Sequence, residues 1–511
     1  MPFGSRESPN KNSKFGISHG SPHSGVCLAT PAPAKSYWMR IATESKPIEQ
    51  IAAGALVVPV FEGVKETRFG AGDLVDAGEI TGKFGELTLL HHPAGLAAQR
   101  VLLAGAGKQE QFDGPAARKL AGIATRFLKA RSVKDVCFAT DPVLAEPVVE
   151  GAILANFDPD RYRTGNDRKS VDAISVTGSP EAAERGRVIA EAQNLTRELV
   201  NEPANRLFPR QLAEAAMKMA AAHGLECDVL NQGQIAALGM GALLGVAQGS
   251  AEPPCLIVVR YKPAEPSGTH HLGLVGKGVT FDTGGISIKP AEGMEKMKYD
   301  MAGGASMIGA MQAIAHLKPK IPVSAFIPAV ENMPGSRAQR PGDIVTTMSG
   351  KTVEVINTDA EGRLILADAL TYARRQGCTH LVDAATLTGA IVVALGHLNV
   401  GLFSNDDAMR DRILAAARAE GERMWPMPLE DDYKDYLKSA FADLANVGGR
   451  WGGAVTAAMF LKEFAEDTPW VHLDIAGTAW IDDEKPKSPL SKGPSGVPVR
   501  TLIRLAMDWA G

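Results

Sequence analysis

The stretch 357–364, with the sequence NTDAEGRL, contains two acidic side chains at a spacing suited to metal binding. Asp359 and Glu361 are two positions apart, and side chains with this spacing in an extended segment project to the same side. Both carboxylates can therefore converge on one cation. Arg363 follows two positions later, which places a positive charge beside the acidic pair.

A second group of charged residues lies earlier in the chain. It consists of two lysines and two aspartates: Lys277, Asp282, Lys289 and Asp300. Four carboxylates gathered in one cleft would repel one another strongly unless protons or divalent metals held them together. Oxygen-rich ligation without Cys or an evident His suits a pair of Mg²⁺, Mn²⁺, Co²⁺ or Zn²⁺ ions ~3.5–4 Å apart, bridged by carboxylate and water. Such a centre generates a hydroxide near neutral pH.

A simpler interpretation is that these acidic residues face solvent and cap helices, which is the usual fate of an isolated Asp or Glu. For Asp359 or Glu361 alone, the sequence does not decide between the two interpretations. The joint presence of two lysines and an arginine favours the metal centre. The HExxH, GxSxG and GxxxxGK(S/T) motifs of other enzyme classes are absent from the sequence, and AGAGK at 104–108 lacks the Ser or Thr of a phosphate loop.

The elements expected around these residues place both groups at strand ends. A strand over 352–356 runs into NTDAEGR and a helix over 363–375, and a strand over 272–275 precedes Lys277. The carboxyl ends of parallel strands that open into helices are where α/β proteins bind ligands. Elsewhere in this part of the chain, strands alternate with helices of about ten or more residues, which predicts parallel βαβ units with helices on both faces.

The length of 511 residues predicts two domains, because one domain usually holds ~100–200 residues. We expect an α/β fold with a smaller N-terminal α/β domain, a connecting helix and a larger C-terminal catalytic α/β domain with a mainly parallel sheet covered by helices. Their residues are 39–180, 181–200 and 201–511. Residues 1–38 are rich in Ser, Gly, Pro and Asn and lack the apolar region of a secretory signal, so we expect a disordered leader. There are two alternatives to a disordered leader: a transit-like segment, or translation that starts at Met39.

Composition and charge restrict the class of protein. With 45% apolar and 22% charged residues, the chain has the balance of a soluble globular protein. The net charge of −4 does not indicate a nucleic-acid partner, although a local basic patch stays open. No apolar run reaches the ~18 residues of a membrane span, so we expect no membrane association. The five cysteines form no CxxC pair and are odd in number, which indicates a reducing compartment and predicts a cytoplasmic protein.

Several motifs resemble the leucyl (cytosol) aminopeptidase family. They are NEPAN at 201–205, VGKGVTFDTGGISIKP at 275–290, MKYDM at 297–301, NTDAEGRL at 357–364, DAATLTGA at 383–390, GGRWGGA at 448–454 and LDIAGTAW at 473–480. The resemblance covers about 198–500, and the combination of NTDAEGRL with KGxxFDxGG is highly specific. Before about residue 180 there is no comparable motif.

The resemblance implies a set of metal ligands. One metal would be held by Lys277, Asp282, Asp300 and Glu361. The other would be held by Asp282, Glu361 and both the side chain and the main-chain carbonyl of Asp359. Asp282 and Glu361 would therefore bridge the two ions. A lysine ligand needs a neutral amine, which burial beside two cations favours by lowering its pKa.

The resemblance also implies catalytic and substrate-binding residues. Lys289 would stay charged and stabilise the oxyanion of the tetrahedral gem-diolate. Arg363, at a helix N-terminus, would hold a bicarbonate that relays the proton of the attacking water. Met297, Thr386 and Gly389 would line a side-chain pocket for Leu-like and Met-like residues, although a core position for Met297 is the alternative.

The expected function is therefore that of a metal-dependent aminopeptidase, a peptide hydrolase. It would release N-terminal amino acids, preferably Leu-like, from peptides with a free N-terminus by hydroxide attack at a two-metal centre. Two Mn²⁺ or Zn²⁺ ions per subunit, a catalytic bicarbonate and a homohexamer with interior active sites are implied by the resemblance.

The sequence gives weaker support to two other functions. Some bacterial members of the family also have a non-enzymatic DNA-binding or regulatory role, but here Lys and Arg are scattered along the chain and support it weakly. A glutathione- or dipeptide-binding module without catalysis is disfavoured, because Lys289 and Arg363 are both retained.

Overall fold

The computed structural model describes residues 39–165, 167–482 and 489–509, so the expected leader at 1–38 lies outside the described residues. One sheet is built from strands within 40–177 and a larger one from strands within 226–474. The long helix α4 (Pro180–Asn201) lies between them in the chain. This is the two-domain α/β fold that the sequence predicts. No helix in the described part of the chain is both long and apolar enough to span a membrane.

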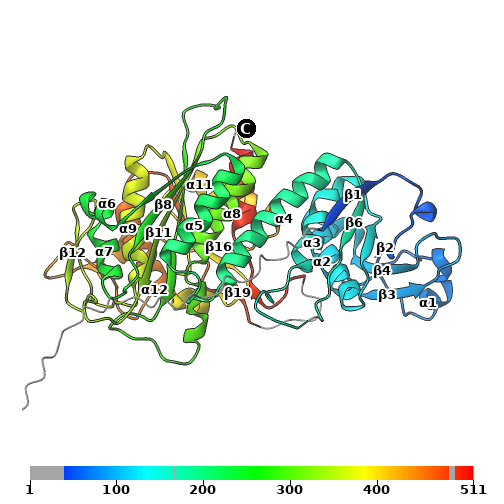
Figure 1. The fold of residues 1–511 in the computed structure, drawn as a ribbon, viewed down its shortest axis with the longest axis horizontal. Helices are drawn as coiled ribbons and strands as arrows, with labels where there is room; N and C mark the ends of the chain where they lie inside the picture. Colours follow the sequence, from blue (N-terminus) through cyan, green and yellow to red (C-terminus); the bar gives the residue numbers. More distant parts are fainter. Residues whose placement is uncertain (1–38, 166, 483–488, 510–511) are drawn as a thin grey trace, which may run out of the picture. The chain divides into compact units, whose positions relative to one another are not determined.

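The smaller domain contains a six-stranded sheet in the order β1-β6-β5-β2-β4-β3. In chain order its strands are β1 (Arg40–Glu44), β2 (Ala55–Phe61), β3 (Leu87–His91), β4 (Arg100–Gly107), β5 (Asp135–Phe138) and β6 (Ala173–Thr177). All neighbours pair parallel except β3, which is antiparallel to β4 at the edge. The inner strand β2 is almost continuously apolar and buried, as a parallel strand covered on both faces must be. Helices α2 (Gly114–Ala130) and α3 (Ala145–Asn156) pack on this domain's core (Figure 1).

Helix α4 connects the two cores. It begins after Ser179, whose side chain accepts a hydrogen bond from the amide of Ala182, and Pro180 occupies its first position. It ends at Asn201, two residues before Pro203, which cannot continue a helix. Along its length it contacts α3 of the smaller domain and α8 (Ala302–Leu317) of the larger one.

The larger domain is built on a nine-stranded sheet in the order β16-β15-β18-β14-β9-β11-β8-β7, with β10 paired to β11. In chain order the strands are β7 (Glu226–Leu230), β8 (Cys255–Tyr261), β9 (Leu272–Gly276), β10 (Gly278–Asp282), β11 (Val323–Asn332), β14 (His380–Ala385), β15 (Val400–Ser404), β16 (Met424–Pro426) and β18 (Trp470–Asp474). The central strands β18, β14, β9 and β11 are mutually parallel. The antiparallel pairs lie toward the two edges.

Helices cover both faces of this sheet, as the sequence predicts (Figure 1). One face packs against α5 (Pro209–His223), α8, α11 (Asp407–Glu420) and α13 (Val499–Asp508). The other packs against α7 (Gly241–Ala247), α9 (Glu361–Arg375) and α12 (Gly453–Ala465). Successive residues of β9 alternate between the two cores: Leu274 enters the first and Val275 the second. The carboxyl ends of the central strands are thus held between two packed layers.

The strand expected over 352–356 is shorter and does not join the central sheet. The observed β13 (Thr352–Glu354) forms a three-stranded sheet with β12 (Ile344–Thr346) and β17 (Leu444–Ala445). Its ladder ends at Glu354 because the next amides bond elsewhere, with Ile356 N and Asn357 N donating to Asn446 Oδ1. The helix expected from 363 begins at Glu361.

Candidate active site

The candidate site lies where several elements end at the carboxyl edge of the central sheet. Lys277 follows β9, and Asp282 is the last residue of β10. Asp300 lies between a short 3₁₀ helix (Met294–Tyr299) and α8, while Glu361 opens α9. Thr386 follows β14, the parallel neighbour of β9. Parallel strands end at the same edge of a sheet, so residues far apart in the chain meet here.

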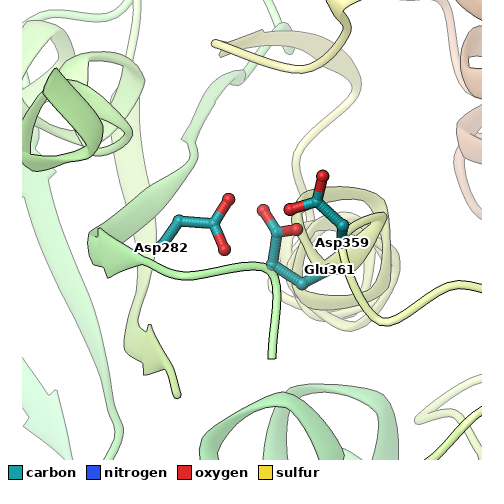
Figure 2. Close-up of side chains that lie close together, drawn as sticks. All are labelled: Asp282, Asp359 and Glu361. Atoms are coloured by element: carbon teal, nitrogen blue, oxygen red, sulfur yellow. The ribbon is translucent and has the colours of Figure 1, made fainter. Parts of the chain in front are cut away.

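Three of the predicted ligands form a compact acidic cluster (Figure 2). One carboxylate oxygen from each of Asp282, Asp359 and Glu361 lies within 4.8 Å of the others. Asp282 and Glu361 are buried, and Asp359 is half-buried. Carboxylates this close repel one another, so the cluster needs positive charge in its midst.

Lys277 joins Asp300 to this cluster. Its Nζ lies 2.8 Å from Asp300 Oδ2 and 2.7 Å from Glu361 Oε1, and it donates to Thr386 O at 3.1 Å. Burial opposes the charged amine, but Asp300 and Glu361 outweigh burial and raise the Lys277 pKa. Among the protein groups alone this lysine is therefore an ammonium. The metal-ligand role implied by the resemblance requires it to release its proton when cations bind.

Lys289 contacts the opposite side of the cluster. Its Nζ lies 2.8 Å from Asp282 Oδ2 and also contacts Asp359 Oδ1. Burial would lower the Lys289 pKa, but the carboxylates of Asp282 and Glu361 raise it. The amine stays charged, and the Lys289 side chain is about one-fifth exposed.

The charges of these protein groups do not balance. Burial, followed by neighbouring carboxylates, raises the pKa values of Asp300, Asp359 and Glu361, with Lys277 and Lys289 opposing the rise. Asp300 Oδ2, Asp359 Oδ1 and both oxygens of Glu361 are buried and make no well-formed hydrogen bond, although lysine nitrogens approach three of them. Buried polar atoms normally find partners. The donor set therefore fits divalent cations, which would satisfy these oxygens and offset the excess negative charge.

Two asparagines that sequence reasoning missed hold the ligands in place. Asn332, the last residue of β11, donates from Nδ2 to Asp282 Oδ1 at 2.8 Å and to Thr358 O at 3.0 Å. Asn446 donates to Asn357 O at 2.7 Å and so fixes the turn that carries Asp359. The available signal for Asn332 was a polar residue at the end of the long apolar run 323–330. Asn446 had none, because its partner is distant in sequence.

Arg363 is buried in the first turn of α9. It donates from Nη1 to Asn446 O at 2.9 Å, while its Nε makes no hydrogen bond. Burial lowers the Arg363 pKa to about 10, with Glu361 and Asp474 opposing the shift. No ion pair of Arg363 occurs among the residues that the structure describes. A buried guanidinium with an unused donor can bind a small anion.

The three predicted pocket residues, Met297, Thr386 and Gly389, differ in how directly they contact the acidic cluster. Thr386 is buried and donates from Oγ1 to Asp300 Oδ1 at 2.7 Å, so it belongs to the cluster. Gly389 opens α10 (Gly389–Leu395) three residues later. Met297 is half-buried, and its carbonyl accepts a hydrogen bond from Asp300 N at 3.3 Å. The Met297 backbone is thus tied to the site through Asp300.

Two family models match the chain. The catalytic domain of the cytosol aminopeptidase family matches residues 194–503, and the N-terminal domain of the same family matches residues 57–166. A probable cytosol aminopeptidase of Solibacter usitatus is 71% identical over 480 residues, which cover 92% of this chain and 100% of that protein. A probable cytosol aminopeptidase of Acidobacterium capsulatum is 48% identical and covers 92% of this chain and 96% of its own length.

Solved structures agree with these matches. A mutant of tomato leucine aminopeptidase superimposes with a TM-score of 0.84 at 32% identity, covering 94% of this chain and 98% of its own. The bottromycin maturation enzyme BotP in complex with Mn superimposes with a TM-score of 0.83 at 34% identity, covering 90% of this chain and 100% of its own. The similarity includes the smaller domain, where the sequence offered no motif. The chain belongs to the cytosol aminopeptidase family and is a peptidase.

Proposed function

We propose that this chain is a two-metal aminopeptidase that releases N-terminal amino acids, preferably Leu-like ones, from peptides. The observation that carries the proposal is the largely buried group of four carboxylates and two lysines, in which the carboxylates outnumber the lysines and Glu361 Oε2 is buried without a partner. The manganese bound in one solved relative and the leucine aminopeptidase activity named for another support it.

The metal ligands would be the carboxylates of Asp282, Asp300, Asp359 and Glu361 together with the amine of Lys277. Mn²⁺ and Zn²⁺ both suit this oxygen-rich set. Two divalent ions bound here would polarise a scissile carbonyl and lower the pKa of an attacking water. The neighbouring Asn332 would keep Asp282 oriented, in the way that outer hydrogen bonds usually orient metal ligands.

The remaining charged residues would act on the substrate. Lys289, which keeps its proton, would place positive charge where the oxyanion of the tetrahedral gem-diolate develops. Arg363 would hold a bicarbonate, a base that would supply the relay for the proton of the attacking water. Met297, Thr386 and Gly389 would line the pocket for the N-terminal side chain.

A chelation experiment with two substrates tests this proposal. The protein, stripped of metal and reloaded with Mn²⁺ or Zn²⁺, should hydrolyse Leu-p-nitroanilide and should leave N-acetyl-Leu-p-nitroanilide intact, because the second lacks a free N-terminus. Hydrolysis that survives chelation, or cleavage of the blocked substrate at the same rate, would contradict the two-metal exopeptidase.

A homohexamer is the assembly we propose for this enzyme. Large apolar side chains on the larger domain, Val393 at 90%, Phe441 at 76% and Trp451 at 69% exposure, support subunit contacts. Light scattering coupled to size-exclusion chromatography would measure the assembly, and a monomer at micromolar concentration would contradict it.

The comparisons above lend no support to the DNA-binding role, and we do not propose it.

A further inference from the structure

The loop that follows β14 holds two of the proposed metal ligands. Thr386 Oγ1 donates to Asp300 Oδ1 at 2.7 Å, and Thr386 O accepts from Lys277 Nζ at 3.1 Å. Asp300 lies before α8 and Lys277 after β9, so neither shares a secondary-structure element with the loop. The position of Thr386 therefore contributes to where these two side chains point, together with the contacts of Lys277 Nζ with Asp300 and Glu361.

Asp474 hydrogen-bonds this loop from the end of the neighbouring strand, β18. It is the last residue of β18, lies opposite Ala385 in the parallel pair with β14, and is 1% exposed. Its Oδ1 accepts from Leu387 N at 3.2 Å, and its Oδ2 accepts from Thr388 Oγ1 at 2.7 Å. Oδ1 also accepts from Ala476 N at 3.2 Å. Within the described residues, Asp474 thus hydrogen-bonds the loop and its own strand end, and none of these hydrogen bonds goes to a proposed ligand.

This arrangement is more specific than a helix cap. Thr388 itself caps α10, since its Oγ1 accepts from Ile391 N at 3.1 Å. Asp474 therefore fixes the capping hydroxyl and the preceding amide together. A buried carboxylate with three donors aimed at it is costly to replace, because an apolar side chain would leave those donors unsatisfied.

We propose that Asp474 is a positioning residue for the metal centre: it fixes residues 386–388 so that Thr386 holds Asp300 and Lys277 in the geometry of ligands. The inference rests on the proposed function of that centre. Residues that orient metal ligands typically change metal affinity or activity about 10–100-fold when they are mutated. Asp474 would act in this way through a loop, without contact to metal or substrate.

Glu422 offers a matched control. Like Asp474 it is a buried carboxylate that accepts one backbone amide and one threonine hydroxyl, from Thr501 N at 3.0 Å and Thr501 Oγ1 at 2.6 Å. Those bonds anchor α13, and among the described residues Glu422 contacts no member of the candidate site. Its loss should therefore cost stability without affecting metal binding.

Metal titration of the full chain separates positioning from general stability. After chelation, the parent, Asp474→Ala and Glu422→Ala would be titrated with Mn²⁺ by calorimetry, and the unfolding midpoint of each metal-free protein would be measured. We expect about a tenfold or greater loss of Mn²⁺ affinity in Asp474→Ala and parent-like affinity in Glu422→Ala. Both variants should unfold at lower temperature than the parent.

Substitution of the loop hydroxyl keeps the test decisive if Asp474→Ala does not fold. Thr388→Val removes the donor to Asp474 and should weaken Mn²⁺ binding, and Thr388→Ser, which restores the hydroxyl, should recover it. At saturating Mn²⁺, kcat of Thr388→Val should approach that of the parent, because the ligands themselves remain.

The outcomes distinguish this role from the metal centre itself. A parent that binds Mn²⁺ while Asp474→Ala or Thr388→Val binds it equally well overturns the positioning role alone. Equal losses of affinity in Asp474→Ala and Glu422→Ala also overturn it, because they indicate a general structural effect. A parent that binds no Mn²⁺ overturns the proposed centre, and the positioning role with it.

Discussion

Two buried groups of charges in this molecule differ in whether their carboxylates are satisfied. Away from the candidate site, Arg118 of α2 donates to Glu150 Oε2 at 2.8 Å and to Glu420 Oε2 at 2.7 Å, and its Nη1 also donates to Glu420 O at 2.9 Å. Among the buried side-chain nitrogen and oxygen atoms that the structure describes, none in these three residues lacks a hydrogen-bond partner. In the candidate site, by contrast, Glu361 Oε2 is buried without a partner, and Oε1 has only the Lys277 ammonium at 2.7 Å.

The difference shows which buried charges point to a ligand. Planar guanidinium groups match carboxylates and complete a structural network without any further partner. The ammonium groups of Lys277 and Lys289 approach the site carboxylates closely but leave oxygens unsatisfied, so this group needs cations that the chain does not supply. Incomplete hydrogen bonding, more than the number of charges, marks the functional cluster.

Replacement of Asp359 with Asn should give the largest effect. The change removes one proposed ligand, and the loss of several kcal/mol of transition-state stabilisation corresponds to a drop of about 10³-fold or more in kcat/KM. Because it also removes one of several mutually repelling charges, the metal-free protein should unfold no more easily than the parent. Leu-p-nitroanilide kinetics and chemical denaturation measure the two effects.

Asp407→Asn is the control for this experiment, because it neutralises a carboxylate that is 88% exposed on α11. Its activity should equal that of the parent. Full activity in Asp359→Asn would show that the acidic cluster is not the catalytic centre.

Replacement of Glu150 with Ala should have the opposite result to Asp359→Asn: it should lower the stability of the fold and leave the activity unchanged. The change leaves the buried Arg118 guanidinium partly unpaired, which typically costs ~3–5 kcal/mol in the free energy of unfolding. The unfolding transition in urea should move to lower concentration, while kcat/KM at a temperature where the variant is folded should stay parent-like. A variant that lost activity without losing stability would remove the distinction between the two groups.

The sequence predicted much of the larger domain because its strands and helices are encoded locally. The strand expected over 272–275 lies within β9, and the helix expected over 363–375 lies within α9. The smaller domain also has the expected α/β fold, although no motif identified its family.

The parts that could not be predicted depend on contacts between distant residues. The strand expected over 352–356 ends early because Asn446 binds the amides of Ile356 and Asn357, and nothing in the local sequence indicates that contact. The contacts of Asp474 could not be predicted for the same reason, since its partners Leu387 and Thr388 are remote in the chain. Ligand types follow from sequence, but the groups that orient them follow from the fold.

Replacement of Gly362 with Ala should have a smaller effect, confined to the candidate site. A Cβ at this position would lie 2.8 Å from Lys277 Nζ and 2.7 Å from its Cε, so the lysine must move away from Glu361. We expect about a tenfold loss of Mn²⁺ affinity by calorimetry, comparable to loss of an orienting contact. Gly72→Ala, at a helix start with open space around it, should bind Mn²⁺ like the parent. Parent-like affinity in Gly362→Ala would argue against Lys277 as a ligand.

The smallest effect should be a pH dependence that belongs to the Arg118 group. Burial, followed by Glu150, raises the Glu420 pKa to about 7 from the ordinary 4.5, against the opposing charges of Arg118 and Arg500. A raised carboxyl pKa means that the folded protein binds more protons than the unfolded chain between these values. The contribution of Glu420 to stability is therefore full below about pH 4.5 and is lost as pH rises through about 7.

Glu420→Gln removes this titration, so the difference in unfolding free energy between the parent and the variant should shift against the parent as pH rises from about 5 to 7. The slope should stay below the ~1.4 kcal/mol per pH unit of one full proton. Urea denaturation at several pH values measures it, with Asp407→Asn as the exposed control. If the difference in unfolding free energy between the parent and Glu420→Gln stays constant with pH, or moves in favour of the parent as pH rises, Glu420 is already ionised in the folded protein. The two groups of charges would then differ in protonation as well as in hydrogen bonding, because burial raises the carboxyl pKa values in the candidate site.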